Sequence, residues 1–436
     1  MKSDRKKIII LTALPFRKQG NQSMIRFVNM FIKREMDVTM FTAGFDDKGE
    51  NAIESSLFKA FKIKSLGFTL TAFLNKKVLK LRKNKVKSDN YFVKIRSEDI
   101  VPPYGSYNLP NLINKWSKYL LYLLDNILLM PYLLLAHFSK IKDSDVVIAY
   151  EEGYTLTARL LARLFGKKYI NKFQGTILKA TNRNISQAIK YFPHNYFTIN
   201  KSDLCIMVQD GTDGEYYARL RGCRNIFFEP HGVYIYEHTK DYKSIVDELK
   251  RKGKFVLFNN ASGSTWKRTD RVIRGLANIK KELLENIVLI TTYHAANRDD
   301  LVEFVKLNNL QDKVIFLDKI DPFESNYIIQ KSNVVIMTND FSNLGNPVLE
   351  AIYYKTPLIS INDGSLDGLV GNGKDCILIN LDRDFDRNMA LAIERMYSDK
   401  AFYKSVKEGL NVNRLVRELS EQQEREFKAI QVLLEQ

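Results

Sequence analysis

The chain alternates between short apolar runs and segments in which apolar residues recur every three or four positions. The apolar runs predict buried strands, and the segments between them predict helices such as Gly20–Glu35 and Tyr154–Phe165. This alternation is typical of an α/β protein with doubly wound parallel sheets. The predicted strands lie in Lys7–Phe16, Asp37–Gly44, Asp145–Tyr150, Lys168–Gly175, Asp203–Gln209, Asn225–Pro230, Lys254–Gly263, Asn286–His294, Lys313–Lys319, Asn333–Met337, Pro357–Ile361 and Cys376–Asn380.

The strands fall into two series, separated by a strongly charged stretch from Tyr236 to Lys254. A chain of 436 residues is also too long for one ordinary hydrophobic core. We therefore predict two Rossmann-like domains in tandem, over residues 1–240 and 241–436.

Charge and cysteine content narrow the partners and the compartment. There are 67 Lys and Arg against 50 Asp and Glu, and the resulting net charge of +17 predicts an anionic partner. The three cysteines, Cys205, Cys223 and Cys376, have no metal-ligand spacing and are typical of a reducing compartment. We expect a cytoplasmic protein, with no secretory signal in the apolar run after MKSDRKK.

A basic and apolar insertion near residues 55–140 interrupts the first domain. Lys59–Arg96 carries 12 basic residues and one acid, interleaved with bulky apolar residues, which fits either an anionic membrane face or a solvated insertion. Tyr119–Phe138 is almost long enough to span a membrane, but Asp125, Asn126 and Pro131 interrupt it, so we expect a buried or interfacial helix pair. If the basic segment contacts an anionic membrane, the N-terminal domain would rest on the inner face of the cell membrane, and the protein would be peripheral.

The second domain contains a βαβ unit that predicts a ligand site. The strand Asn333–Met337 is followed by a loop, Thr338–Gly345, and by a helix that we expect Asn346 to cap, with Pro347 as its first residue. In parallel sheets ligands bind beyond the carboxyl ends of the strands, and a helix N-terminus there favours anions such as phosphate. Glu350, in the first turn, is a candidate ligand contact; otherwise it complements the helix dipole.

Several short motifs, in order along the chain, resemble those of glycosyltransferase family 4, whose members are retaining enzymes of GT-B fold. SNLGNPVLE at Ser342–Glu350 is similar to the family's E-x7-E segment, and WKRTD is similar to its K-G-x-D motif. PHGV at Pro230–Val233 resembles the end of the family's first domain, and Gly20 resembles the glycine of its first βα loop. The resemblance implies two Rossmann-like domains that face each other across a donor-binding cleft.

The resemblance also implies roles for individual residues. Glu350 would bind the donor ribose and Lys267 would neutralise the diphosphate leaving group, and these two are the predicted catalytic residues. The other predicted donor-binding residues are Gly20, Arg268, Ser342, Asn343, Leu344, Gly345, Asn346, Pro347 and Val348. Gln174, Gly175 and His231 are the predicted acceptor-side residues.

The implied activity is transfer of a hexose from a nucleotide-diphosphate sugar, UDP-linked by default, with retention of anomeric configuration. The acceptor would be a cell-surface glycan, a lipid-linked glycan or a protein. We expect no metal and no cofactor, because cationic side chains and the helix dipole would do that work, and we find no zinc spacing or P-loop. Nucleic acid is not an expected partner, since RNA-binding signatures are missing.

The sequence departs from the family pattern in three places, and the first two support an alternative. Ser342 stands where the first Glu of E-x7-E is expected, and NNASGST lacks the Arg that normally precedes Lys267. Arg268 also replaces the Gly of the K-G pair. The alternative hypothesis is a non-catalytic, nucleotide-binding partner protein on a decayed glycosyltransferase scaffold.

Overall fold

The computed structural model describes residues 5–16, 22–44, 53–63, 91–100, 109–239, 241–261, 265–292, 298–318, 320–411 and 415–436. The chain divides into two compact units. Unit 1 comprises residues 1–87, 107–230 and 420–436, and unit 2 comprises residues 88–106 and 231–419. Gly20 and the segment 64–90 lie outside the described residues, so the predictions made for them stay predictions.

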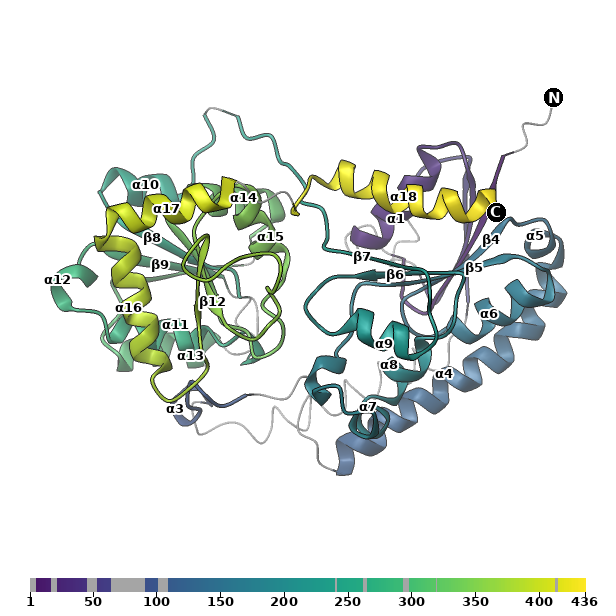
Figure 1. Cartoon of the computed structure of the whole chain (residues 1–436), viewed down its shortest axis with the longest axis horizontal. Helices are drawn as coiled ribbons and strands as arrows, with labels where there is room; N and C mark the ends of the chain where they lie inside the picture. Colours follow the sequence, from purple (N-terminus) through teal and green to yellow (C-terminus); the bar gives the residue numbers. More distant parts are fainter. Residues whose placement is uncertain are drawn as a thin grey trace. The chain divides into compact units, whose positions relative to one another are not determined.

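Unit 1 is built on a seven-stranded, fully parallel sheet in the order β3-β2-β1-β4-β5-β6-β7 (Figure 1). The interior strands are runs of β-branched and aliphatic residues that are buried on both faces, as expected of a parallel sheet. The strands are β1 (Lys7–Thr12), β2 (Asp37–Thr42), β3 (Phe58–Lys62), β4 (Val146–Tyr150), β5 (Lys168–Phe173), β6 (Leu204–Val208) and β7 (Ile226–Glu229).

Helices cover both faces of this sheet. One face packs against α1 (Gln22–Ile32) and α18 (Leu419–Glu435). The helices of the other face are α4 (Leu109–Ala136), α5 (Phe138–Lys142), α6 (Thr155–Leu164), α7 (Ile185–Tyr191), α8 (Pro193–Thr198) and α9 (Gly214–Leu220), with the 3-10 turn η1 (Leu178–Thr181). Unit 1 is therefore a three-layer α/β domain.

Unit 2 has a six-stranded parallel sheet in the order β10-β9-β8-β11-β12-β13. The strands are β8 (Phe255–Asn259), β9 (Ile287–Thr292), β10 (Val314–Leu317), β11 (Val334–Met337), β12 (Leu358–Ile361) and β13 (Cys376–Ile379). Strands β9 and β10 are added on one side of β8, and β11, β12 and β13 on the other, so the direction of the strand order reverses between β8 and β11. This reversal is a topological switch point, where parallel sheets open a crevice for ligands.

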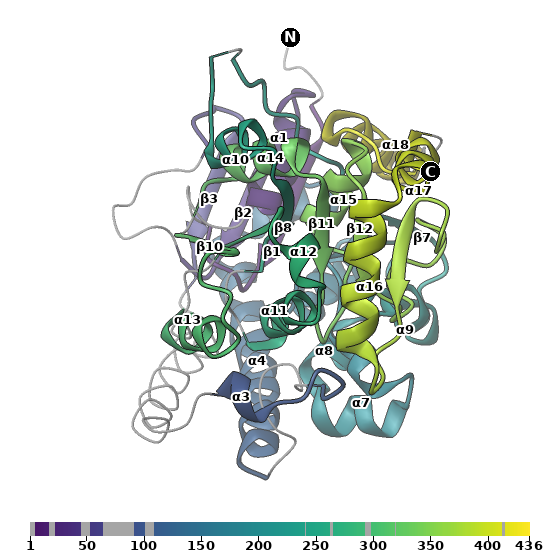
Figure 2. The ribbon, with the colours of Figure 1, turned by 90° about the vertical axis from the view of Figure 1, so that its left-hand side faces the viewer.

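The helices of unit 2 also form two layers (Figure 2). One layer contains α3 (Tyr91–Lys94), α11 (Thr269–Ala277), α13 (Arg298–Leu307), α16 (Phe385–Ser398) and α17 (Lys400–Asn411), with the short α12 (Lys281–Leu284) beside β9. The other layer contains α10 (Ile245–Arg251), α14 (Pro322–Lys331) and α15 (Asn346–Tyr353). Local sequence sets their starts: the side chain of Asp321 caps α14, and Ser244 with Asp247 forms a capping box on α10.

The division into two units corrects the predicted domain boundary at residue 240. The second unit begins at His231, and the C-terminal helix α18 returns to unit 1, where Figure 1 shows it beside α1. Phe427 packs on Phe31, and the buried ammonium of Lys172 on β5 lies 2.6 Å from the carboxylate of Glu426. The prediction failed because the apolar stripe of α18 gives no information about which sheet it covers.

Residues 91–100 also depart from the predicted domains, because they belong to unit 2. Phe92 is fully buried among the residues of α11, α13 and α16. The backbone carbonyl of Arg96 accepts a hydrogen bond from Arg268, the N-cap of α11. Those of Ser97 and Asp99 accept from Arg271 on α11. The described end of the basic segment Lys59–Arg96 is thus a structural part of unit 2.

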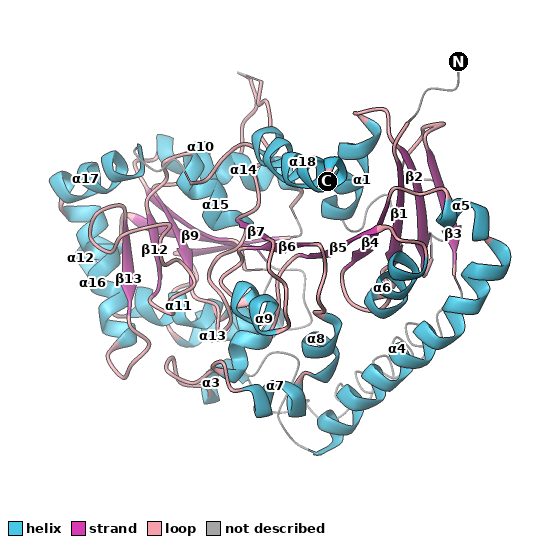
Figure 3. Cartoon of the chain, turned by 45° about the vertical axis from the view of Figure 1, so that its right-hand side comes forward, coloured by secondary structure: helices cyan, strands magenta, loops and turns pink. Residues whose placement is uncertain are grey.

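Two further parts of the predicted insertion are regular elements of unit 1 (Figure 3). Phe58–Lys62 forms the edge strand β3. The predicted helix pair is one continuous helix, α4, with Pro131 inside it. Over Lys115–Ala136 this helix is long and apolar enough to cross a membrane by length and composition.

Candidate functional site

The predicted donor residues meet at the switch point of unit 2. Lys267 and Arg268 follow β8, and Ser342–Val348 follows β11. Two hydrogen bonds join these loops: the amide of Asp340 donates to the carbonyl of Trp266 at 2.9 Å, and the Thr338 hydroxyl donates to the carbonyl of Arg268 at 2.9 Å. Residues 75 positions apart in sequence therefore form one surface at the carboxyl edge of the sheet.

The loop between β11 and α15 is held by Asn343, which is fully buried. Its side-chain oxygen accepts from the amide of Asn339 at 2.8 Å, and its side-chain nitrogen donates to Asp363 at 3.2 Å. Its own amide donates to the hydroxyl of Ser365 at 2.9 Å. Asn343 and the buried Leu344 therefore shape the loop from the inside, and the half-buried Ser342 has a left-handed φ of 41°.

The N-terminus of α15 begins one residue earlier than predicted. Gly345 is the N-cap, Asn346 is the first helical residue and Pro347 follows in the first turn. The amides of Val348 and Leu349 both donate to the carbonyl of Gly345, at 3.0 and 3.2 Å. In the part of the chain that the structure describes, no hydrogen bond uses the amide of Gly345 or Asn346, so these donors and the positive end of the helix dipole remain for an anion.

Lys267 ends the 3-10 turn η2 (Thr265–Lys267) and is half-buried. Its ammonium nitrogen lies 4.3 Å from the ring centroid of Trp266, and no described carboxylate pairs with it. Loss of solvation lowers the pKa of Lys267 to about 8. A partly desolvated cation without a protein counter-ion gains from an anionic ligand, because the ligand restores the lost electrostatic stabilisation.

Arg268 has a left-handed φ of 52°, which explains why a glycine suits this position of the motif. Its guanidinium is fully buried and uses all five N–H groups inside unit 2: it pairs with both oxygens of Asp270, at 3.0 and 2.9 Å, and bonds Asp340 and the carbonyls of Arg96 and Asp99. This corrects the predicted contact between Arg268 and the donor, because no N–H is left for a phosphate.

Arg271 completes the same buried cluster. It lies 2.7 Å from the carboxylate of Asp340 and donates to the carbonyls of Ser97 and Thr338, each at 2.7 Å. Burial lowers the pKa of Arg271 to about 10, while Asp340 opposes this shift. The cluster fixes the two loops that carry Lys267 and Ser342–Val348, so it positions the candidate site.

Glu350 is the fifth residue of α15, at the start of its second turn, and is half-buried. Its carbonyl accepts the amide of Tyr354, and burial raises the pKa of that tyrosine, with the charge of Glu350 as a smaller cause. The structure thus places Glu350 on the helix whose N-terminus faces the switch point.

The acceptor-side prediction falls on the carboxyl edge of unit 1. Gln174 and Gly175 follow β5, as predicted, and the side-chain amide of Gln174 donates to the hydroxyl of Tyr150 at 2.6 Å. The amide of Gln174 donates to the carboxyl group of Glu151 at 2.5 Å. His231, the third predicted acceptor-side residue, belongs to unit 2.

Two carboxyl groups that the sequence analysis missed flank Gln174 and Gly175. Glu151 follows β4 with a left-handed φ of 62°, and Asp210 follows β6. A Cβ atom on Gly175, whose φ is 138°, would lie 1.8 Å from the Asp210 carboxylate, so only glycine fits. Burial raises the pKa of Glu151 to about 8 and that of Asp210 to about 7, so both are partly protonated near neutral pH.

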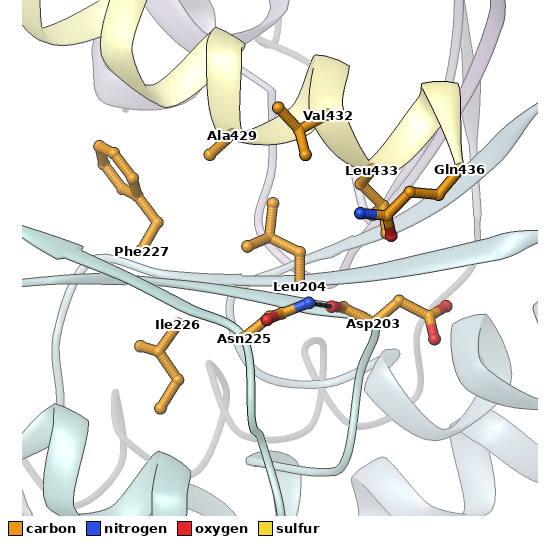
Figure 4. A pocket seen from close by; sticks show the side chains of 9 residues that line it. All are labelled: Asp203, Leu204, Asn225, Ile226, Phe227, Ala429, Val432, Leu433 and Gln436. Carbon is orange, nitrogen blue, oxygen red and sulfur yellow. Dashed lines mark hydrogen bonds between the residues drawn. The ribbon is translucent and has the colours of Figure 1, made fainter.

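Two cavities of unit 1 lie at the opposite, amino-terminal edge of its sheet. One, of about 300 Å³, lies between α18 and the starts of β6 and β7 (Figure 4), and its lining includes Leu204, Phe227 and Leu433. The other, of about 240 Å³, lies at the starts of β1, β2 and β3. Neither contains a predicted site residue. Among the described residues, no group of three or more His, Cys, Asp or Glu side chains could hold a metal ion.

Most of unit 2 is similar in sequence to a known family of enzymes. Residues 242–409 match the family model of glycosyl transferases group 1. The match lies entirely within unit 2, which holds the switch-point site, and covers most of that unit. No curated protein matches the chain in sequence.

Solved structures show the fold of both units. Sucrose-phosphate synthase from Thermosynechococcus elongatus aligns with a TM-score of 0.64 at 14% identity, covering 98% of this chain and 99% of that one. HepE of Anabaena in complex with UDP-glucose aligns at 0.61 and 11% identity, over 98% and 99% of the two chains. A TarM mutant of S. aureus in complex with fondaparinux, alpha-GlcNAc-glycerol and UDP aligns at 0.61 and 13% identity, over 99% and 100%. The chain has the GT-B fold, as predicted.

Proposed function

We propose that this protein is a retaining glycosyltransferase that moves a hexose from a UDP-sugar to a glycan or lipid-linked acceptor. The observation that carries the proposal is the meeting of Lys267 and the N-terminus of α15 at the switch point of unit 2. The family match on the same unit supports it, as do the structures of similar fold that were solved in complex with UDP-glucose or UDP.

In this proposal unit 2 binds the donor. The Lys267 ammonium and the amides of Gly345 and Asn346 contact the diphosphate, and Glu350 accepts hydrogen bonds from the ribose hydroxyls. Negative charge builds up on the diphosphate as the bond to the sugar breaks, so fixed positive groups there lower the barrier. No metal ion is required, because Lys267 and the helix dipole supply the positive field.

The acceptor binds at the carboxyl edge of unit 1. Glu151 and Asp210 are partly protonated near neutral pH, so each carboxyl group can donate or accept a hydrogen bond to a sugar hydroxyl. Gln174 and Gly175 lie between them. Retention follows in the proposal if the departing phosphate takes the proton of the acceptor hydroxyl, with the new bond formed on the face that the phosphate leaves.

The experiment is release of nucleoside diphosphate from a panel of UDP- and GDP-sugars, with and without an extract of membrane glycans. We expect release from a UDP-sugar, and Lys267→Ala should lower it at least about tenfold, because the variant lacks the positive charge that stabilises the leaving diphosphate. Lys281→Ala, at an exposed lysine of α12, is the matched control. Equal turnover by Lys267→Ala and the wild type would disprove the assignment.

A second candidate is a nucleotide-binding partner protein on a decayed scaffold. Ser342 replaces the expected first Glu, and all five N–H groups of Arg268 are used within the protein. Tight UDP binding without turnover of any sugar in the panel would favour this candidate.

A further inference from the structure

Helix α4 has one buried face and one exposed apolar face. Tyr122, Leu129 and Leu133 pack in the core of unit 1. The side chains on the opposite side recur at intervals of one, three, four and seven residues, which places them on one helix face. They are Ile113, Leu120, Leu124, Ile127, Leu128 and Leu135, and their exposed fractions range from 42% to 87%.

The buried face binds α4 firmly to unit 1. The side-chain amide of Asn126 donates to the carbonyls of Tyr122 and Gly153, and its oxygen accepts from the amide and the hydroxyl of Thr157, at 2.9 and 2.8 Å. A bilayer span would break these bonds and leave a buried amide unpaired. The helix is therefore placed to lie on a surface rather than to cross one.

Helix α6 extends the exposed apolar surface. Leu156, Leu160 and Leu164 recur every four residues and are 37% to 60% exposed. α6 lies beside α4 on the same face of the sheet (Figure 3), and Phe165 at its end contacts the ring of Phe138 with centroids 5.4 Å apart. These three leucines and the six aliphatic residues of α4 are together called the α4–α6 face.

Basic residues border the α4–α6 face. Lys142 ends α5, Arg163 lies in the last turn of α6, and Lys167 follows it. Arg163 and Lys142 are exposed. Of the two acids that follow Lys142, Asp145 is engaged by Lys6 and by the amide of Lys7, and Asp143 is exposed, so the border is basic on balance. An aliphatic surface with a basic border is complementary to an anionic lipid surface.

We infer that the α4–α6 face binds the surface of a membrane that contains anionic lipid. Its composition fits lipid: its nine members are all Leu or Ile, and the exposed Tyr132 and Phe138 beside them are residue types that favour the membrane–water interface. The inference deepens the proposed function, on which it rests for the choice of a lipid-linked acceptor; the binding itself requires only unit 1.

Vesicle co-sedimentation tests the inference. The full-length protein is mixed with vesicles of phosphatidylcholine alone or with phosphatidylglycerol added, at low and high salt. We expect binding to the anionic vesicles only, and weaker binding at high salt, because the screening length falls from about 10 Å at 0.1 M to about 3 Å at 1 M. The triple variant Leu124→Asp, Ile127→Asp, Leu128→Asp should lower the bound fraction at least about tenfold, since it places three charges on the apolar face.

The matched control is Leu307→Asp with Leu391→Asp, two exposed leucines on helices of unit 2, which should bind vesicles like the wild type. Circular dichroism and UDP affinity verify that every variant is folded. The inference is overturned if the wild type binds neither vesicle, if the triple variant binds as well as the wild type, or if light scattering shows that the triple variant dissociates an oligomer. If the triple variant loses vesicle binding but still releases UDP from a UDP-sugar, the α4–α6 face is separate from the donor site. If the wild type binds vesicles but releases no UDP from any UDP-sugar, only the proposed function is refuted.

Discussion

The lowered pKa of Lys267 makes UDP binding depend on pH. Desolvation brings this pKa from 10.5 to about 8. A group with a pKa of about 8 is charged in about nine molecules out of ten at pH 7 and in about one out of ten at pH 9. If the diphosphate binds only the charged form, the affinity for UDP falls about tenfold between these two pH values.

Isothermal titration of UDP at pH 7, 8 and 9 measures this change, and two variants show which group causes it. Lys267→Arg keeps its charge over the whole range, because a guanidinium has a pKa above about 12, so its affinity should stay constant. Lys267→Ala has no charge to lose, so its affinity should be low and constant. The direction of the effect is fixed by the sign of the charge: binding weakens as the pH rises.

Two results would refute this reasoning. A constant affinity in the wild type would mean that Lys267 does not contact the diphosphate or does not titrate in this range. The same tenfold fall in Lys267→Arg would mean that another group titrates. Either result refutes the pH dependence that is assigned here to Lys267.

Three further changes have defined outcomes. Asp340→Asn should lower the free energy of unfolding by about 3 kcal/mol in urea denaturation, because it removes the charge that compensates two buried guanidinium groups, whereas Asp367→Asn, at an exposed position, should change it by less than about 0.5 kcal/mol. Gly175→Ala should destabilise unit 1 in urea denaturation by more than Gly222→Ala, since its Cβ would overlap the carboxylate of Asp210. Gly222→Ala, also at a positive φ but with only an ordinary contact 3.8 Å from the Cβ of Lys201, should cost about 1–2 kcal/mol. In the folded state Glu151 has a pKa of about 8, against 4.5 for the unfolded chain, so the free energy of unfolding falls as the pH rises from 4.5 to 8. Glu151→Gln should reduce that fall in urea denaturation. The same pH profile in the variant and the wild type would contradict the raised pKa.

Most of the fold could be predicted because its strands are continuous apolar runs. Every strand predicted from such a run is present, and the two series form the two sheets. The missed strand, Phe58–Lys62, mixes aromatic and basic residues at a sheet edge without a strict alternation, a composition that equally suits a basic surface. Asp125 and Asn126 suggested a break in α4, but the tertiary bonds of Asn126 satisfy its polar side chain within the helix.

The candidate site could be predicted in part, for a related reason. Lys267 and Ser342–Val348 stand out because each follows a strand in a recognisable local pattern. The buried cluster of Arg268 depends on carbonyls about 170 positions away, and a local pattern carries no information about such partners. Glu151, next to Glu152, and Asp210 look like ordinary acids in loops, and only the parallel sheet brings Glu151 and Asp210 to the same edge.

Diffraction from a crystal soaked with UDP tests the donor site most directly. We predict density for the nucleotide at the switch point of unit 2, with the diphosphate against Lys267 and the amides of Gly345 and Asn346, and with the ribose hydroxyls on Glu350. UDP bound elsewhere in the protein, or bound at the switch point with its diphosphate away from Lys267, would contradict the proposed donor site.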